Sequence, residues 1–230
     1  MGHPGYHIIH SGDGSDSVGI HGTTVSFHST RGAFTESMQV FIENGLNHYL
    51  EQYRPVQIRI LEIGFGTGLN ALLTAQVLNT VQLPARYTSI DRDPLPGEVY
   101  NRLNYDAYTQ ASGLYRQLMT APWNQEVPIA GRLLLQKIRA DLLEYQPEGI
   151  YDICYFDAFA PDDQPELWTP AVFRKIRSHM REGGVLVTYC SKSVVRKTLK
   201  EVGFTVEKLK GPPGKREVVR ATAVSGASGY

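Results

Sequence analysis

The sequence predicts a single α/β domain built on a mostly parallel sheet. Short β-branched, apolar segments alternate with helical segments over most of the 230 residues, and this alternation is typical of parallel sheets. Near the C-terminus, two segments of alternating apolar and polar residues flank the turn "GPPGK", which predicts an antiparallel hairpin. We therefore expect a mostly parallel, seven-stranded sheet whose last two strands form that hairpin.

The first predicted unit is a strand, a tight turn and a helix. Residues 56–63, "VQIRILEI", are β-branched and apolar, and a glycine-rich turn follows them. Residues 67–80 carry leucines at helical spacing. Residues 85–91, "ARYTSID", form the next strand, which Pro94 helps to stop. The chain thus enters the sheet in a strand–helix–strand order.

The later elements continue this alternation. Thr169 and Pro170 are typical of a helix N-cap and first turn, and Gly203 follows the end of another helical segment. The remaining predicted elements are helices between Gly97 and Thr120, strands at 132–139 and 151–157, a helix at 170–181, a strand at 184–190, a helix at 191–203, and hairpin strands at 204–211 and 216–222.

The zero net charge hides two halves of opposite sign. Between Ala171 and Arg220 there are thirteen Lys or Arg residues against four Asp or Glu, so this segment carries +9 and the rest of the chain −9. No apolar run is long enough for a membrane span, and the N-terminus does not resemble a signal peptide, so we expect a cytoplasmic protein without membrane contact. Cys154 and Cys190 lie in apolar strands, which predicts buried thiols rather than a disulfide or a metal pair.

Four acidic residues follow the ends of predicted strands. Ligands of parallel sheets bind beyond the carboxyl ends of the strands, so one fold would gather these acids at a common rim. Each acid alone is better explained as a helix cap or a loop residue, but four in succession favour a shared site. They are Glu62, Asp91, Asp141 and Asp157.

The glycine loop "GFGTG" predicts close backbone approach to a ligand. Gly64, Gly66 and Gly68 permit positive φ and place amides at the start of a helix. The loop lacks the Lys-Ser/Thr ending of a nucleotide triphosphate loop, and its spacing is not that of a dinucleotide loop. Glu62 would repel a pyrophosphate but suits the ammonium of S-adenosylmethionine, and Asn70 at the start of the helix is a further candidate for binding it.

Two more acids fit the rest of such a methyl donor. Asp91 can accept hydrogen bonds from both ribose hydroxyls, and Asp141 can face the adenine amino group. In this order they favour a methyl-donor site over other uses of a glycine loop. We predict no metal site.

The segment "FDAFAPDDQPELW" is where a methyl acceptor would meet this donor. Methyl transfer needs an aligned, unprotonated acceptor, so Asp157 is predicted to orient an amine and to take up its proton, with Phe159 and Pro161 forming an apolar pocket. Trp168 either packs beneath the loop or stacks on a base. The two cysteines lie outside this loop, so a cysteine nucleophile is not supported.

These motifs resemble the methyltransferase domain of the tRNA wobble-uridine modification enzyme MnmC and its free-standing MnmD-type relatives. The resemblance covers most of the chain and rests on "FHSTRGAFTESMQVFIENGL", "LEIGFGTGLNALL", "DAFAPDDQPELWTPAVF", "GGVLVTY" and "EVGFTVEKLKGPPGKRE". It implies a Rossmann-like class I fold and S-adenosylmethionine-dependent methylation of 5-aminomethyl-2-thiouridine in tRNA, giving 5-methylaminomethyl-2-thiouridine. Carried over to this sequence, Glu62, Gly64, Gly66, Asp91, Asp141 and Asp157 become donor-site or catalytic residues.

The same resemblance implies an organisation of the chain. Residues 56–230 would be the methyltransferase domain, and residues 1–55 an N-terminal extension that contributes to the substrate site. Phe34 and Glu36 would close over the nucleotide, while Phe41 suits either that role or the core. The family usually has glycine where Ala158 stands, and often has glutamate at the position of Asp91.

The basic C-terminal segment becomes a candidate RNA surface. We expect an RNA backbone to cross it, whereas the alternative is a solvated helix face. A fused oxidase would need several hundred more residues, so we expect this chain to perform only the methylation, as a monomer, with a separate oxidase or the complex that installs the aminomethyl group as a partner. The candidate RNA contacts are Lys192, Arg196, Lys197, Lys200, Lys208, Lys210, Lys215 and Arg216.

Three other functions remain open at this point. One is methylation of a small-molecule amine, and another is a module that binds S-adenosylmethionine without catalysis. A nicotinamide-dependent oxidoreductase is the third.

Overall fold

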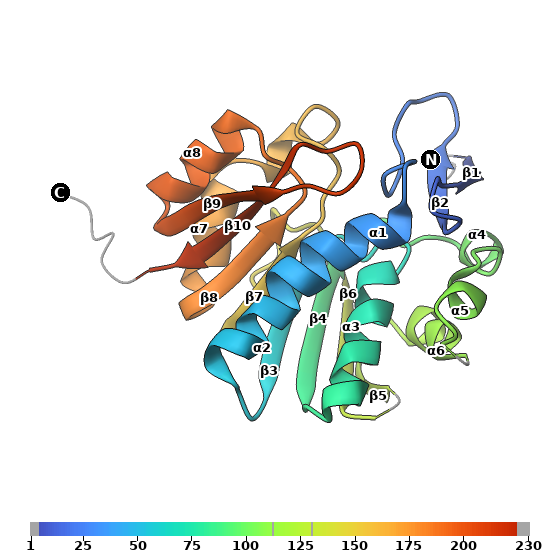
Figure 1. The fold of residues 1–230 in the computed structure, drawn as a ribbon, viewed down its shortest axis with the longest axis horizontal. Helices are drawn as coiled ribbons and strands as arrows, with labels where there is room; N and C mark the ends of the chain where they lie inside the picture. Colours follow the sequence, from blue (N-terminus) through green and yellow to red (C-terminus); the bar gives the residue numbers. More distant parts are fainter. Residues whose placement is uncertain (1–4, 112, 130, 225–230) are drawn as a thin grey trace.

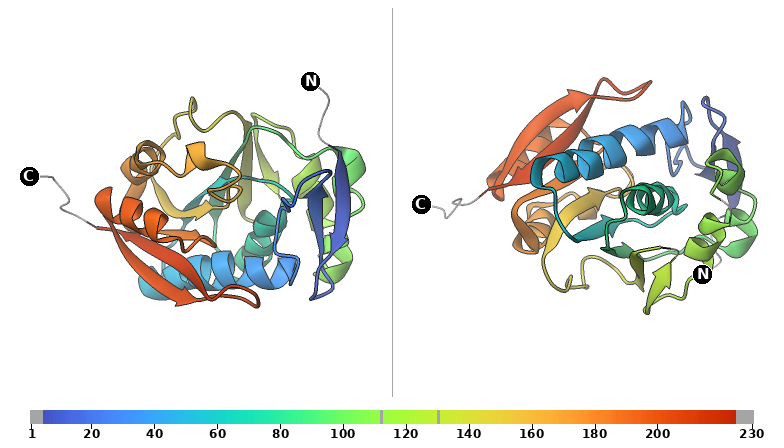
Figure 2. Two further views of the ribbon diagram at one scale, coloured as in Figure 1. Left: turned by 90° about the horizontal axis from the view of Figure 1, so that it is seen from above. Right: turned by 60° about the horizontal axis from the view of Figure 1, so that its bottom comes forward.

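The computed structural model describes residues 5–111, 113–129 and 131–224. They form three layers, with a central sheet between two layers of helices (Figure 1). Figure 2 shows the same layers from above and from below. No helix in this described part is long and apolar enough to cross a membrane.

An eight-stranded sheet forms the middle layer. Its strand order is β5-β6-β4-β3-β7-β8-β10-β9. The strands from β6 to β8 run parallel, whereas β5, β10 and β9 are antiparallel to their neighbours. The strands are β3 (Ile58–Ile63), β4 (Ala85–Asp91), β5 (Glu126–Ile129), β6 (Leu133–Arg139), β7 (Tyr151–Phe156), β8 (Met180–Thr188), β9 (Phe204–Lys210) and β10 (Glu217–Ala223).

Alternate residues of each inner strand pack into two separate cores. Ile60 and its partner Ile153 face one core, whereas Leu61 and its partner Cys154 face the other. Because successive side chains on a strand point to opposite faces, a strand buried on both sides must be apolar throughout. The largely apolar segments "ILEI" and "ICYF" therefore favour places for β3 and β7 at the centre of the sheet.

Helices cover both faces. A continuous helix of α1 (Ala33–Ser37), a π-helical stretch η1 (Met38–Asn47) and α2 (His48–Tyr53) lies beside α3 (Leu69–Val81) on the first face. Figure 1 shows this long helix crossing in front of the sheet. The second face is covered by α7 (Pro170–Ser178) and α8 (Ser193–Glu201), and the short helices are α4 (Gly97–Tyr100), α5 (Tyr105–Tyr108), α6 (Leu114–Thr120) and η2 (Pro165–Leu167).

Two elements that were not expected from the sequence precede the first predicted strand. The strands β1 (Tyr6–His10) and β2 (Asp16–Ile20) form a separate antiparallel hairpin. The long helix that follows is largely buried, and Phe41 lies in its core face with 1% of its surface exposed. Phe41 is thus a core residue rather than a lid over the nucleotide.

The predicted fold class is confirmed, but the number of strands is wrong. The sheet has eight strands rather than seven, because β5 adds an antiparallel edge next to β6. This strand is only four residues long and contains Pro128, and both features argue against a strand when the sequence is considered alone.

Two local predictions can also be checked directly. The side chain of Thr169 accepts a hydrogen bond from the amide of Val172, which confirms the predicted helix cap. Cys154 and Cys190 are free, buried thiols, as expected.

Candidate active site

A cavity of about 1030 Å³ opens at the carboxyl ends of the parallel strands. This volume is at the upper end of the range usual for small-molecule sites. The glycine loop, the ends of β4, β6 and β7, the segment before α1 and the turn between β9 and β10 all contribute to its wall. Among the predicted site residues, the cavity is lined by Gly64, Gly66, Asp91, Asp141, Asp157, Phe159, Glu36 and Lys215.

The glycine loop is in contact with two other parts of the cavity wall. Gly64 has φ of 89°, and a Cβ built on it would lie 2.7 Å from the backbone oxygen of Asp157. Gly66 has φ of 49°, and its Cβ would lie 3.0 Å from Cδ1 of Phe27. Side chains at these positions would therefore be strained and would push the loop away from both neighbours.

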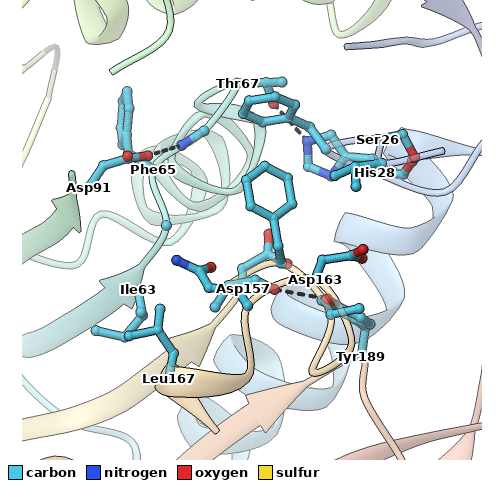
Figure 3. Close-up of a pocket in the computed structure, with 18 of the residues that line it drawn as sticks. Ser26, His28, Ile63, Phe65, Thr67, Asp91, Asp157, Asp163, Leu167 and Tyr189 are labelled. Atoms are coloured by element: carbon cyan, nitrogen blue, oxygen red, sulfur yellow. Dashed lines mark hydrogen bonds between the residues drawn. The ribbon is translucent and has the colours of Figure 1, made fainter. Parts of the chain in front are cut away.

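Asp91 is held against the glycine loop. Its Oδ2 accepts a hydrogen bond of 2.9 Å from the amide of Gly66, and its Oδ1 accepts one of 3.0 Å from the amide of Asp93 (Figure 3). Burial raises the pKa of Asp91, while these amides oppose the rise. A fixed carboxylate beside a loop of glycines is suited to binding the hydroxyl groups of a ribose.

Asp141 lies on the same part of the rim. Its Oδ1 accepts a hydrogen bond of 2.8 Å from the amide of Leu143, and its Oδ2 is 3.5 Å from Nη1 of Arg92. The side chain remains 28% exposed and lines the cavity. Asp91 and Asp141 are thus brought together by the parallel pairing of β4 with β6.

Glu62, Asn70 and Asp157 form a hydrogen-bonded chain beneath the cavity. The Nδ2 of Asn70 donates to Oε1 of Glu62 at 3.2 Å and to Oδ2 of Asp157 at 2.8 Å. Ser89 donates to the other oxygen of Glu62 at 2.7 Å. Glu62 is fully buried and is not among the residues that line the cavity, so in this structure its carboxyl group acts on the site through Asn70.

The carboxyl groups of Glu62 and Asp157 both have raised pKa values. Burial raises the pKa of Asp157 to about 7, and the negative charge of Glu36 adds to the rise, while Asn70 and Lys215 oppose it. Burial likewise raises the pKa of Glu62 to about 8, against the hydrogen bond from Ser89. A carboxyl group with a pKa near neutrality can exchange protons under physiological conditions.

An aromatic pair connects the segment before α1 with the loop after β7. The rings of Phe27 and Phe159 meet edge to face, with centroids 5.2 Å apart. The neighbouring His28 is buried, and its Nε2 lies 2.7 Å from Oγ1 of Thr67 (Figure 3). Burial lowers the pKa of His28 to about 4, so this imidazole is neutral at physiological pH. The segment before α1 thereby forms a wall of the cavity.

Several predicted site residues lie away from the cavity. Trp168 is 7% exposed and donates through Nε1 to the backbone oxygen of Phe159 at 2.8 Å, so it packs beneath the acceptor loop. Phe34 packs on Tyr108 instead, with centroids 5.2 Å apart. Lys192 is paired with Asp162 at 2.6 Å on the surface. The other predicted residues outside the cavity lining are Gly68, Pro161 and Arg216.

Phe27, His28 and Tyr189 contribute to the cavity but were not selected from the sequence. Tyr189 directly follows β8, so the strand-end rule that found the four acids would also have found it. Phe27 and His28 carry no comparable signal, because the segment before α1 has no strand or helix periodicity. Within the described residues, no group of three His, Cys, Asp or Glu side chains is placed to hold a metal ion.

Comparisons with known proteins point to one family. The model of a family described as S-adenosyl-L-methionine-dependent methyltransferase matches residues 106–224. The tRNA 5-methylaminomethyl-2-thiouridine biosynthesis bifunctional protein MnmC of Burkholderia multivorans is 34% identical over 210 residues, and that of Cupriavidus necator is 32% identical over 213 residues. These matches cover 84% and 85% of this chain but only 31% of each relative.

Solved structures agree with the fold. The crystal structure of MNMC2 from Aquifex aeolicus superposes with a TM-score of 0.78 at 25% identity, covering 95% of this chain and 70% of that one. Spermidine synthase from Thermotoga maritima superposes with a TM-score of 0.61 at 15% identity, covering 96% of this chain and 69% of that one, and this similarity concerns the fold alone.

Proposed function

Because the chain belongs to the family of S-adenosyl-L-methionine-dependent methyltransferases, we propose that it methylates the primary amine of 5-aminomethyl-2-thiouridine at the wobble position of tRNA, giving 5-methylaminomethyl-2-thiouridine. The MnmC relatives carry the biosynthesis of this product in their names, and the match includes most of the present chain. The observation that carries the proposal is Asp157, a carboxyl group with a pKa of about 7 at the wall of the cavity.

The residues of the cavity fit the methyl donor. Gly64 and Gly66 leave no room for side chains in the loop, and Asp91 offers a carboxylate beside it. When bound, S-adenosylmethionine supplies an electrophilic methyl group on a sulfonium. We propose that Asp91 binds the ribose hydroxyls and Asp141 the adenine amino group, while Glu62 and Asn70 support the loop from beneath.

Asp157 is proposed to prepare the acceptor. A primary amine is protonated in water and has no free lone pair until it loses a proton. The carboxylate of Asp157 can accept a hydrogen bond from this amine, orient it and take its proton. Asn70 holds the carboxylate at 2.8 Å, and the rings of Phe27 and Phe159 reduce access of water.

The basic segment supports an RNA substrate. Lys197 and Lys200 on α8 and Lys210 and Arg216 on the C-terminal hairpin are exposed, so their charges are available to phosphates. We propose that the tRNA backbone contacts this face, and that residues 1–55 contribute to the substrate site. A cytoplasmic location, a monomeric state and a separate oxidase or aminomethyl-installing partner remain predictions.

The direct test is methyl transfer from labelled S-adenosylmethionine to tRNA from cells that lack this modification. We expect label in 5-methylaminomethyl-2-thiouridine with the wild type and none with Asp157→Ala, measured by mass analysis of nucleosides. Label in a small amine that competes with tRNA would support methylation of a small molecule instead. Donor binding without transfer to any nucleoside would contradict the tRNA proposal and favour a binding module.

A further inference from the structure

The turn between β9 and β10 places a lysine side chain in the candidate active site. Lys215 lines the cavity together with Asp157 and Tyr189. The turn reaches toward the segment before α1 (Figures 1 and 2). A Cβ on Gly214 would meet the side chain of Arg31. Arg31 and Gly214, more than 180 positions apart in the sequence, thereby share one wall of the site.

The ammonium group of Lys215 is bound on two sides. Its Nζ donates a hydrogen bond to Oε2 of Glu36, and it lies 3.9 Å from the centroid of the Tyr189 ring. A carboxylate and the face of an aromatic ring are the two groups that bind alkylammonium ions in proteins. Lys215 is therefore a primary ammonium ion held in a site with the chemistry of an ammonium receptor.

This receptor is rigidly built. Glu36 is 4% exposed, and its Oε1 accepts a hydrogen bond of 3.0 Å from the amide of Ser29. The hydroxyl of Tyr189 donates to the backbone oxygen of Ala158 at 2.8 Å, which fixes the ring beside the acceptor loop (Figure 3). A buried carboxylate would be costly without a cation, so the fold requires some positive group at this position.

Asp157 interacts electrostatically with both Glu36 and Lys215. The charge of Glu36 raises the pKa of Asp157, and the charge of Lys215 lowers it. Figure 3 shows Asp157 and Tyr189 close together in the wall of the cavity. A cation between Glu36 and Tyr189 is therefore also near the carboxylate that is proposed to accept a proton.

We propose that Glu36, Tyr189 and Asp157 form the subsite for the acceptor's primary ammonium group, and that Lys215 occupies it as an internal stand-in until the acceptor replaces it. The inference rests on the proposed function, since the end of a lysine side chain and an aminomethyl substituent present the same group, a methylene bearing an ammonium. The alternative is that the ion pair of Lys215 with Glu36 permanently links the hairpin to α1.

A small ammonium ion can separate these alternatives without any RNA. Propylammonium chloride carries the same methylene-ammonium group but no phosphate, sugar or base, and propanol is its neutral counterpart. We would titrate both into the full chain saturated with S-adenosylhomocysteine and follow binding by NMR. The variants are Lys215→Met, which keeps the length of the side chain without its charge, and Lys210→Met, a matched control on the exposed face of the same hairpin.

We expect Lys215→Met to bind propylammonium at least about tenfold more tightly than the wild type or Lys210→Met, with no gain for propanol. Adding Glu36→Gln to Lys215→Met should remove the gain. Adding Tyr189→Phe should preserve it, because the ring remains, whereas adding Tyr189→Leu should lose it. Retained binding of S-adenosylhomocysteine and a cooperative melting transition would show that each variant is folded.

Equal affinity for propylammonium in the wild type and Lys215→Met would overturn the inference, as would a gain that survives Glu36→Gln. The proposed function is tested separately by the tRNA assay. If the tRNA is methylated but Lys215→Met does not bind propylammonium more tightly than the wild type, the proposed function holds and the proposed subsite is refuted. If Lys215→Met binds propylammonium more tightly but no tRNA is methylated, the proposed subsite holds and the acceptor must be a different primary amine.

Discussion

The two sides of the cavity are assembled in different ways. The side with Asp91 and Asp141 comes from the ends of neighbouring parallel strands, β4 and β6, together with the glycine loop after β3. The opposite side joins Glu36, Asp157 and Lys215 from α1, the loop after β7 and the C-terminal hairpin. The proposed donor side is therefore built by the sheet and the glycine loop, whereas the proposed acceptor side also depends on segments from both ends of the chain.

This difference suggests a division of labour. A site made by the sheet can be shared by many methyltransferases, because the pairing of the strands positions its residues. A site made by added segments can vary without disturbing the sheet, and it is suited to selecting the acceptor. If this division holds, substitutions on the two sides should affect donor binding and acceptor turnover separately.

The largest effect is expected on the acceptor side. Asp157→Asn keeps the size of the side chain but removes the base, so kcat/KM for tRNA should fall by about 10²–10⁴. The wild-type kcat/KM should rise with pH through about 7, where Asp157 loses its proton, and the variant should lack this rise. Calorimetry with S-adenosylhomocysteine should give nearly the wild-type affinity, and a large loss of that affinity would refute the division.

The next largest effect is expected on the donor side. Asp91→Asn retains an acceptor for the amide of Gly66 but loses the charge that would bind two ribose hydroxyls. Because hydrogen bonds to a charged group contribute about 1.5–3 kcal/mol, the dissociation constant of S-adenosylhomocysteine should rise about 10- to 100-fold. The KM for tRNA at saturating donor should stay near the wild-type value. A raised KM for tRNA with normal donor affinity would show that the two sides of the cavity do not act separately.

The difference between the two sides of the cavity also explains which site residues and strands could be predicted from the sequence. Asp91, Asp141 and Asp157 could be found because each follows a strand whose apolar pattern is clear, and parallel pairing then brings them together. Glu62 also lies near the end of a strand, but its side chain is buried beneath the cavity, where Asn70 of α3 donates a hydrogen bond to it. The residue pattern does not distinguish this position from one that faces the cavity. The edge strand β5 was missed because it has only four residues and contains a proline, Pro128.

The acceptor side could be predicted only in part. The sequence suggested Glu36 and Lys215 as separate candidates, but their ion pair depends on how the hairpin crosses α1. Trp168 and Phe34 were equally plausible aromatic contacts, yet one packs under the loop and the other faces Tyr108. Contacts between distant segments are set by tertiary packing, which no local pattern records.

A third prediction concerns Glu62, which lies beneath both sides. Its pKa is about 8 in the folded protein and near the ordinary 4.5 when unfolded, so the folded form keeps a proton that the unfolded form releases. The resulting stability is complete below about pH 4.5 and is lost as the pH rises to about 8. Glu62→Gln should remove this dependence, so the variant should gain on the order of 4 kcal/mol relative to the wild type between pH 5 and pH 8.5.

Urea unfolding at the two pH values measures this difference. The pKa of Asp157 is also raised, so Asp157 adds a pH dependence of the same sign to the stability of both proteins. The difference between the wild type and the variant therefore reports the contribution of Glu62 alone. If the pH dependence of the two proteins were the same, Glu62 would be ionised in the folded state. A buried negative charge at this position would then be available to the donor's ammonium group, as first expected from the sequence.

The smallest effect is expected on the basic face outside the cavity. Lys197 and Arg216 are exposed, so Ala at either position should raise the KM for tRNA only a few-fold and leave kcat unchanged, since a single phosphate contact is lost. Each substitution should also reduce the slope of log KM against log salt by about 1. Arg86→Ala provides the control, because this exposed arginine lies near the start of β4, at the opposite end of the strand from Asp91. An equal salt slope in all three variants would mean that the tRNA backbone does not cross this face, and selection of the acceptor would then depend on the cavity alone.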